Sequence, residues 1–268
     1  MAEVYVNSWQ DFVTAIGAAG DTVILPEEAE WDMNTILPYG LQSDITFACK
    51  KIDGRGTRIK NLNLNNYKFQ YSEQDIKVIY NLLMTDWIGT NQWFDLRYGS
   101  EWFRCAISGI TSASCIIYNS NSYNYSAVEM VSCAINVESS ASRFYVVESG
   151  GGSYKYCRIE AHAPNDDVGD LGNGAYFCCE LVFYAPNATN RLYVYNFKNG
   201  NLLRGNLKSI PEIAKTFAPW EGLTSVYDDD MFSDTVTSPF PQNFVACTEE
   251  QLKDAAYLRS LGFPIVVG

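Results

Sequence analysis

Short runs of alternating apolar and polar residues follow one another along most of the chain, separated by turns of Gly, Asn, Asp and Ser. The first three runs are TVIL (22–25), ITFAC (45–49) and TRIKNLNL (57–64). A period of two residues is typical of a strand with one buried face. Between Asp21 and Asn206 no helical period interrupts the runs, so the crossover helices of an α/β sheet are not expected. The pattern predicts an all-β fold.

Five cysteines each begin the same short apolar pattern, which reads CAIS, CIIY, CAINV, CRIEA and CELVF at Cys105, Cys115, Cys133, Cys157 and Cys179. The steps from Cys115 onward are 18, 24 and 22 residues, about the length of one coil of a parallel β-helix. A cysteine and the residue two positions later point the same way in a strand, so we expect the thiols to stack in an internal ladder. Cys105 and Cys115 are only 10 residues apart and are expected on different faces of one coil.

The repeat predicts a solenoid of about eight coils over residues 21–206, as a rod on the order of 40 Å long. An antiparallel sandwich is the alternative architecture. Residues 1–20 contain a helix pattern, capped by Ser8, that is expected to plug the open end of the first coil. Residues 207–268 are expected to form a C-terminal cap or tail. A helix at about 248–261 in this tail would close the rod or mediate assembly.

Composition narrows the classes of partner. The net charge of -12 and the pI near 4.5 disfavour binding to nucleic acid or to an anionic membrane. The first residues, MAEVYVNSWQDF, have no signal-peptide pattern, and no run of about 18 apolar residues occurs. We therefore expect synthesis in the cytoplasm without a signal peptide. The eight cysteines are expected to be reduced core residues, because the zinc alternative lacks a CxxC pair or a His partner.

Candidate binding residues come from an aromatic-rich stretch and from acidic loops. Exposed aromatic rings offer a stacking surface for sugars or a patch for a partner, although packing against long turns explains the same residues. These ligand candidates are Trp87, Trp93, Tyr98, Trp102 and Tyr123. Weak metal candidates are Asp166, Asp167, Asp228 and Asp230, which solvated loops also explain. No cofactor is expected.

His162 is the only histidine in the chain. Its position beside Asp166 and Asp167 would allow a general-acid role. The alternative is a histidine at a strand end with no chemical task, and we prefer this interpretation. A mechanism that needs two imidazoles is excluded.

Three segments carry a resemblance to a known family. They are DTVILP (21–26), IDGRGTRI (52–59) and TEEQLKDAAYLRSLGFP (248–264). With them the chain resembles right-handed parallel β-helix proteins of the pectin-lyase-like superfamily, and among these the non-catalytic ones of phages and prophages of gut bacteria. Arg58-Ile59-Lys60 is similar to the RIK with which polygalacturonases of this fold hold a substrate carboxylate. Their partner motifs NTD, Gly-Asp-Asp and Gly-His-Gly are missing, so no catalytic residue is assigned.

The resemblance implies a virion structural protein, such as a tail appendage, spike or head decoration. Its partners would be other virion proteins or further copies of itself, in a homo-oligomer such as a trimer, and a host cell-surface polysaccharide. The alternative is a carbohydrate-active enzyme, either a polysaccharide lyase or a glycosidase, with paired acids on one long face. A bacterial surface adhesin is a third, less favoured class.

Overall fold

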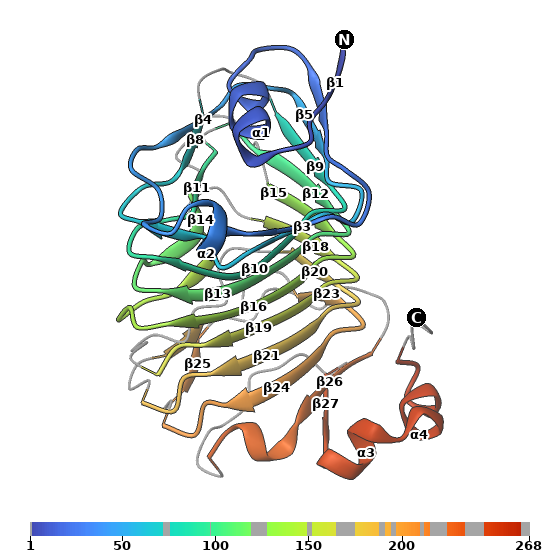
Figure 1. The fold of residues 1–268 in the computed structure, drawn as a ribbon. Coiled ribbons are helices and arrows are strands. Elements are labelled where there is room, and N and C mark those ends of the chain that lie inside the picture. The colour runs from blue at the N-terminus through green and yellow to red at the C-terminus, as the bar shows by residue number, and fades with distance from the viewer. Residues whose placement is uncertain are drawn as a thin grey trace.

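A computed structural model of the chain describes residues 2–71, 76–96, 98–118, 128–148, 152–164, 175–187, 191–193, 197–209, 212–214, 224–233 and 244–263. The chain winds into a parallel β-solenoid (Figure 1). Every strand pairing among these residues is parallel, so the antiparallel sandwich is wrong.

The strands form three stacked sheets and one short pair, which we name sheets A, B and C and the β22–β25 pair. Sheet A contains β1 (Glu3–Tyr5), β2 (Thr22–Ile24), β5 (Lys51–Asp53), β9 (Lys77–Tyr80), β12 (Ser100–Phe103), β15 (Val128–Val131), β18 (Gly152–Lys155), β20 (Ala175–Phe177) and β23 (Phe197–Asn199). Sheet B contains β3 (Glu30–Asp32), β6 (Arg58–Lys60), β7 (Asn63–Asn65), β10 (Leu83–Gly89), β13 (Ala106–Thr111), β16 (Ala134–Ser139), β19 (Arg158–His162), β21 (Glu180–Tyr184), β24 (Leu202–Asn206), β26 (Ser225–Asp228) and β27 (Phe244–Cys247). Sheet C contains β4 (Ile45–Phe47), β8 (Phe69–Tyr71), β11 (Phe94–Asp95), β14 (Cys115–Tyr118) and β17 (Tyr145–Glu148), and the short pair joins β22 (Arg191–Tyr193) to β25 (Glu212–Ala214).

Few helices accompany the strands. They are α1 (Trp9–Ile16), α2 (Met33–Ile36), the 3-10 turn η1 (Asp229–Met231), α3 (Glu249–Lys253) and α4 (Ala255–Ser260). Helix α1 begins where predicted, because the Ser8 hydroxyl accepts a hydrogen bond from the Asp11 N–H at 3.1 Å. It lies at the N-terminal end of the stack and contacts β2 and β4 (Figure 1). Within the described ranges no helix has the length and apolar character needed to cross a bilayer.

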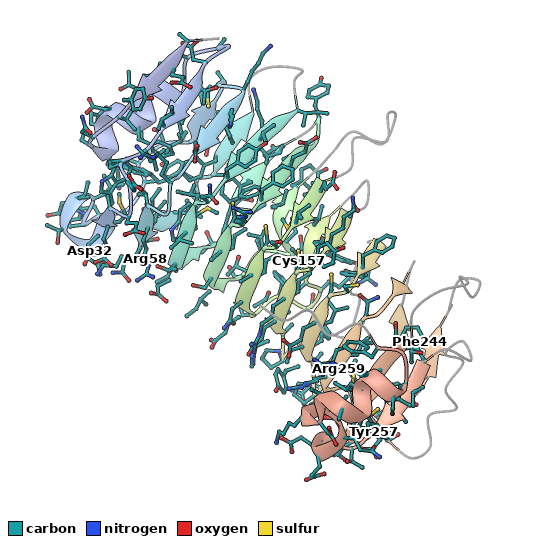
Figure 2. All side chains as sticks on the ribbon, turned by 90° about the vertical axis from the view of Figure 1, so that its right-hand side faces the viewer. Asp32, Arg58, Cys157, Phe244, Tyr257 and Arg259 are labelled. Carbon is teal, nitrogen blue, oxygen red and sulfur yellow. The ribbon has the colours of Figure 1, made fainter. Side chains whose placement is uncertain are left out.

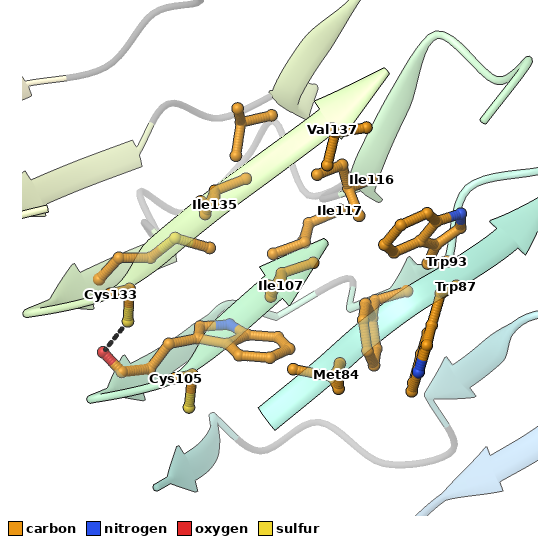
Figure 3. Packing of buried hydrophobic residues seen from close by; sticks show 14 of the residues in the cluster. Met84, Trp87, Trp93, Cys105, Ile107, Ile116, Ile117, Cys133, Ile135 and Val137 are labelled. Atoms are coloured by element: carbon orange, nitrogen blue, oxygen red, sulfur yellow. Dashed lines mark hydrogen bonds between the residues drawn. The ribbon is translucent and has the colours of Figure 1, made fainter. Parts of the chain in front are cut away.

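A ladder of inward side chains builds the core. Adjacent strands of sheet B stack Ile107, Ile135, Ile159 and Leu181 in register, and all four are buried. Figure 3 shows the first two, Ile107 and Ile135. Each such side chain contributes about 1.5–3 kcal/mol when it leaves water. The steps along this ladder are 28, 24 and 22 residues. Between residues 21 and 206, sheets A and B each stack eight strands that follow one another along the path of the sheet, in agreement with the expected number of coils.

The cysteine ladder exists, but its first member differs from the expected one. It runs through Cys105, Cys133, Cys157 and Cys179, each at the corner just before a sheet B strand. Cys115 lies in β14 of sheet C instead, on a different face of the coil from Cys105.

Each thiol of the ladder hydrogen-bonds to a main-chain carbonyl of the preceding coil, as Cys133 Sγ does to the Trp102 oxygen at 3.4 Å. Hydrogen bonding with the neighbouring thiols of Cys105 and Cys157, together with burial, raises the pKa of Cys133. The buried Cys133 thiol is therefore a protonated, structural group.

The end of the chain forms an arm, which we define as α3 and α4, on the outer face of sheet B. Strands β26 and β27 continue sheet B beyond Asn206, where the tail was expected to begin. Their outward residues Val226 and Val245 continue the register of Leu202, and the arm covers these residues with Leu252 and Leu258. This small apolar cluster is separate from the core of the solenoid.

Candidate functional site on the outer face of sheet B

Three of the aromatic ligand candidates lie inside the solenoid. Trp87, Trp93 and Trp102 are 1%, 0% and 0% exposed, so the expectation that they offer a stacking surface is wrong. Figure 3 shows Trp87 and Trp93 within the core. Trp87 Nε1 donates to the Ile59 carbonyl at 2.9 Å, and Trp102 Nε1 donates to the Ser100 hydroxyl at 2.7 Å. Their rings pack as core side chains, as in the Trp87–Phe69 stack with centroids 5.6 Å apart.

Of the other two aromatic candidates, the structure describes only Tyr98. Tyr98 is partly exposed in the turn before β12, and Tyr123 lies outside the described residues. Tyr98 lines neither of the two hollows described below. The prediction that Tyr98 and Tyr123 bind a ligand stays a prediction.

Of the four acidic metal candidates, the structure describes two. Asp166 and Asp167 lie outside the described residues. The Asp228 carboxylate accepts the Asp230 N–H at 3.1 Å and so caps η1. Asp230 forms an ion pair with Lys208 Nζ at 2.7 Å. Across the described ranges no three His, Cys, Asp or Glu side chains gather as metal ligands.

The basic side chains of the Arg58-Ile59-Lys60 segment form ion pairs with acidic side chains of the neighbouring strand β3. Lys60 Nζ lies 2.6 Å from Glu30 and 3.5 Å from Asp32, and Arg58 lies 3.8 Å from Glu30. Asp32 and Arg58 stand on the same edge of the molecule in Figure 2. The Asn61 amide hydrogen bond, followed by contacts that include Lys60, lowers the pKa of Asp32. Arg58 and Lys60 thus form ion pairs with carboxylates of the same chain. This arrangement disfavours a role for the two side chains in binding a substrate carboxylate.

A longer polar network crosses sheet B farther along the stack. Arg158 of β19 donates to Glu160 at 3.2 Å, and its Nε lies 3.8 Å from Glu180 of β21. Arg204 of β24 approaches Glu180 from the next coil at 3.8 Å. His162 Nε2 lies 2.9 Å from the second oxygen of Glu160. Two carboxylates, two guanidinium groups and the only imidazole thus meet on one outer face.

The network sets the protonation state of Glu160. The hydrogen bond with His162, and then that with Arg158, lowers the pKa of the Glu160 carboxyl. A partly buried carboxylate with two such partners stays ionised at neutral pH. It orients the imidazole, whose ring also stacks on Tyr184 with centroids 4.5 Å apart.

Beside the network lies a hollow that we name the sheet B groove. It has a volume of about 440 Å³, within the usual size range of small-molecule sites. Its lining residues are Ile110, Glu138, Ser139, Ser140, His162, Pro164, Tyr184 and Pro186. Ile110, Glu138, His162 and Tyr184 occupy the same register position on four successive strands. The groove therefore crosses four coils along the stack.

A second hollow, of about 390 Å³, lies between the arm and the corner of the solenoid. Arg158, Glu180 and Arg204 line one side of it, and Leu252 and Leu258 of the arm line the other. The arm and the polar network thus share one space, which we name the arm hollow. Its charged groups already face one another, so the sheet B groove is the better candidate for an outside ligand.

The sequence contained a signal for this groove. Ile110, Glu138, His162 and Tyr184 each lie five residues after a ladder cysteine, at Cys105, Cys133, Cys157 and Cys179. Aligning the cysteine repeat would have placed the four side chains in one row. It would also have paired His162 with Glu160, two residues away on the same face, instead of with Asp166 or Asp167.

The fold and the groove are thus defined by the chain's own geometry. No family model, no curated protein and no solved structure matches this chain.

Proposed function

We propose that the chain is a non-catalytic, right-handed β-helix of the pectin-lyase-like type that serves as a structural component of a phage or prophage particle. It would be a tail appendage, spike or head decoration, made in the bacterial cytoplasm and incorporated into the virion. In the particle it would form a homo-oligomer of three chains, contact other virion proteins and bind a cell-surface polysaccharide of the host. The parallel stack with its continuous core supports a load-bearing role of this kind.

One observation carries the choice of a non-catalytic role: Glu160 is held ionised by His162 and Arg158. A glycosidase needs one carboxyl group that keeps its proton near neutral pH, and this requires a raised pKa. The pKa of Glu160 is lowered, and Arg158 also lies against Glu180. This arrangement favours ion pairs that stabilise the face over groups poised for acid catalysis.

The packing of helix α1 supports our proposal that this helix plugs the open N-terminal end of the solenoid. Its side chains Trp9, Phe12 and Ile16 are buried and join the main core. Trp9 and Phe12 also contact the ring of Trp31, which lies in the first strand of sheet B. An apolar helix at this end would keep the first coil from pairing with another chain.

A carbohydrate-active enzyme is the second candidate, because Glu160 and Glu180 converge on Arg158 from adjacent strands beside a groove. Two carboxylates close together are what glycosidases use. Under this alternative, Glu160→Gln and Glu180→Gln would each abolish turnover.

The test combines mass and activity on the purified chain. Light scattering is expected to give about three times the chain mass of 30.1 kDa. Incubation with polygalacturonate, glucan and chitin is expected to yield neither unsaturated products nor new reducing ends. Immunogold labelling of particles from an induced lysogen that encodes the chain should decorate the virion. Turnover that is lost in Glu160→Gln, together with unlabelled particles, would establish the enzyme instead.

A further inference from the structure

We propose that the sheet B groove is a saccharide site that selects neutral and amino sugars over sugar acids. The inference rests on the proposed glycan-binding role and assigns it a place and a ligand class. It departs from the acidic polysaccharide that the resemblance to polygalacturonases would suggest.

The groove is a row of outward side chains repeated coil by coil. Ile110 is 51% exposed and Tyr184 is 37% exposed, although both are apolar or aromatic residues in the middle of a sheet. Adjacent strands lie about 4.8 Å apart, so the row forms a stepped surface parallel to the stack axis. Pro164 and Pro186 line its other side. An elongated ligand can lie along this surface across four coils.

The aromatic end of the row is held in place before any ligand arrives. His162 is fixed by Glu160 at 2.9 Å on one side and by the stacked Tyr184 ring on the other. Its Nδ1 has no hydrogen-bond partner among the residues that the structure describes. The groove thus presents an oriented ring edge with one remaining polar atom, and a pre-oriented site loses less entropy on binding.

The mixture of lining groups matches the two surfaces of a sugar. A pyranose ring has an apolar C–H face and a rim of hydroxyl groups. Ile110, Tyr184 and the two prolines offer apolar and ring surfaces for the face. Glu138 and His162 offer hydrogen-bonding atoms for the rim. Purely apolar ligands would leave these polar groups unpaired, which disfavours them.

Charge decides which sugars fit. Among the residues that the structure describes, Glu138 is the one carboxylate that lines the groove, no Lys or Arg lines it, and Glu138 forms no ion pair or hydrogen bond. The guanidinium group of Arg158, on the same strand as His162, is hydrogen-bonded to Glu160. A uronic or sialic acid would bring a second negative charge next to Glu138, in a chain whose net charge is already -12. An amino sugar would instead gain a charge-assisted hydrogen bond.

The experiment uses three tetrasaccharides of equal length that differ in charge: tetra-N-acetylchitotetraose, chitotetraose and tetragalacturonate. Binding to the full chain is measured by calorimetry and by saturation-transfer NMR. The neutral and the amino tetramer are expected to bind, and tetragalacturonate at least about tenfold more weakly than either. Failure of both the neutral and the amino tetramer to bind, or preferred binding of tetragalacturonate, would overturn the proposal.

Variants assign any binding to the groove. Tyr184→Ala is expected to weaken both favoured tetramers at least about tenfold, whereas Tyr184→Phe should change them little. Glu138→Gln should weaken chitotetraose about tenfold and leave the neutral tetramer nearly unchanged. Tyr39→Ala, at a tyrosine that is 83% exposed and lies outside the groove, is the matched control.

Three outcomes separate this inference from the proposed function. Unchanged binding by a folded Tyr184→Ala chain would place the sugar elsewhere and overturn the groove assignment. A chain that is trimeric and labels the virion, but binds none of the tetramers, would overturn the groove alone. A monomer that binds as expected would keep the groove and overturn the assembly.

Discussion

The residue at the corner before each sheet B strand makes a recurring contribution to the solenoid. A residue with positive φ, such as Arg104, Ser132 or Tyr156, turns the chain there. The next residue points inward and satisfies a carbonyl of the preceding coil, which the cysteine thiols do at 3.4–3.6 Å. Asn201 takes over this position after Cys179. Its amide donates to the Tyr176 carbonyl at 3.0 Å, and its side-chain oxygen accepts the Cys179 N–H at 3.0 Å.

Substitutions at Asn201 should therefore separate the two hydrogen bonds. Asn201→Ala removes both partners at a fully buried position and is expected to lower the free energy of unfolding by about 3 kcal/mol. Asn201→Cys can restore the donor to the Tyr176 carbonyl in the manner of the ladder cysteines, and should cost about 1 kcal/mol less than the alanine variant. Urea titration measures both. Equal losses for the two variants would show that the corner carbonyl does not need a donor.

Single residues also show why the sequence analysis wrongly expected buried aromatic side chains to lie on the surface. In SEWF (100–103) both phases of the alternation contain an aromatic ring, so the pattern does not tell whether Trp102 or Phe103 points inward. Its pairing with the coils on either side resolves the phase, and it is Trp102 that is buried. The cysteine repeat, in contrast, has one apolar phase and correctly predicted an inward ladder, except that Cys115 belongs to another sheet.

The arm is an element whose boundaries the sequence did not fully predict. The sequence predicted one helix at about 248–261, beginning at a Thr248–Gln251 capping box, and that box is present. The chain then breaks at Asp254, whose carboxylate accepts the N–H groups of Ala256 and Tyr257 at 2.8 and 3.1 Å and starts a second helix. An aspartate inside an apolar stripe is compatible with one long helix or with two. The backbone turn that decides between them depends on packing against β26 and β27.

Because the arm has its own small apolar cluster, it should open without unfolding the solenoid. Leu258 is buried in that cluster, and Leu258→Ala is expected to cost about 2 kcal/mol of arm docking. Hydrogen exchange of amides in residues 249–260 should then become about 30-fold faster, while exchange in β13 and β16 stays unchanged. Lys253→Ala, at a largely exposed position of the same arm, is the control and should leave both regions unchanged. Faster exchange throughout the stack would mean that the arm and the solenoid form one cooperative unit.

At the scale of the whole molecule, the stack makes each coil depend mainly on its two neighbours. The described tryptophans report on one half of it, because Trp9, Trp31, Trp87, Trp93 and Trp102 are all buried within the first 102 residues. Trp220 lies outside the described residues, and Trp220→Phe would confine the fluorescence signal to that half. Circular dichroism, in contrast, reports on strands along the full length. The two signals can therefore follow the two ends of one solenoid separately.

In the Trp220→Phe background, Leu203→Ala removes a fully buried side chain from β24, far from every tryptophan that remains. The cavity left by this substitution should lower the free energy of unfolding by about 3 kcal/mol. The guanidinium midpoint measured by circular dichroism should then fall more than the midpoint measured by fluorescence. The reason is that unfolding can begin in the C-terminal coils and stop before it reaches the coils that contain the tryptophans. Leu62→Ala, equally buried near the N-terminal end, should move the fluorescence midpoint at least as far as the dichroism midpoint. If Leu203→Ala shifts both midpoints equally, the coupling between coils exceeds the cost of the cavity, and the rod unfolds as a single body.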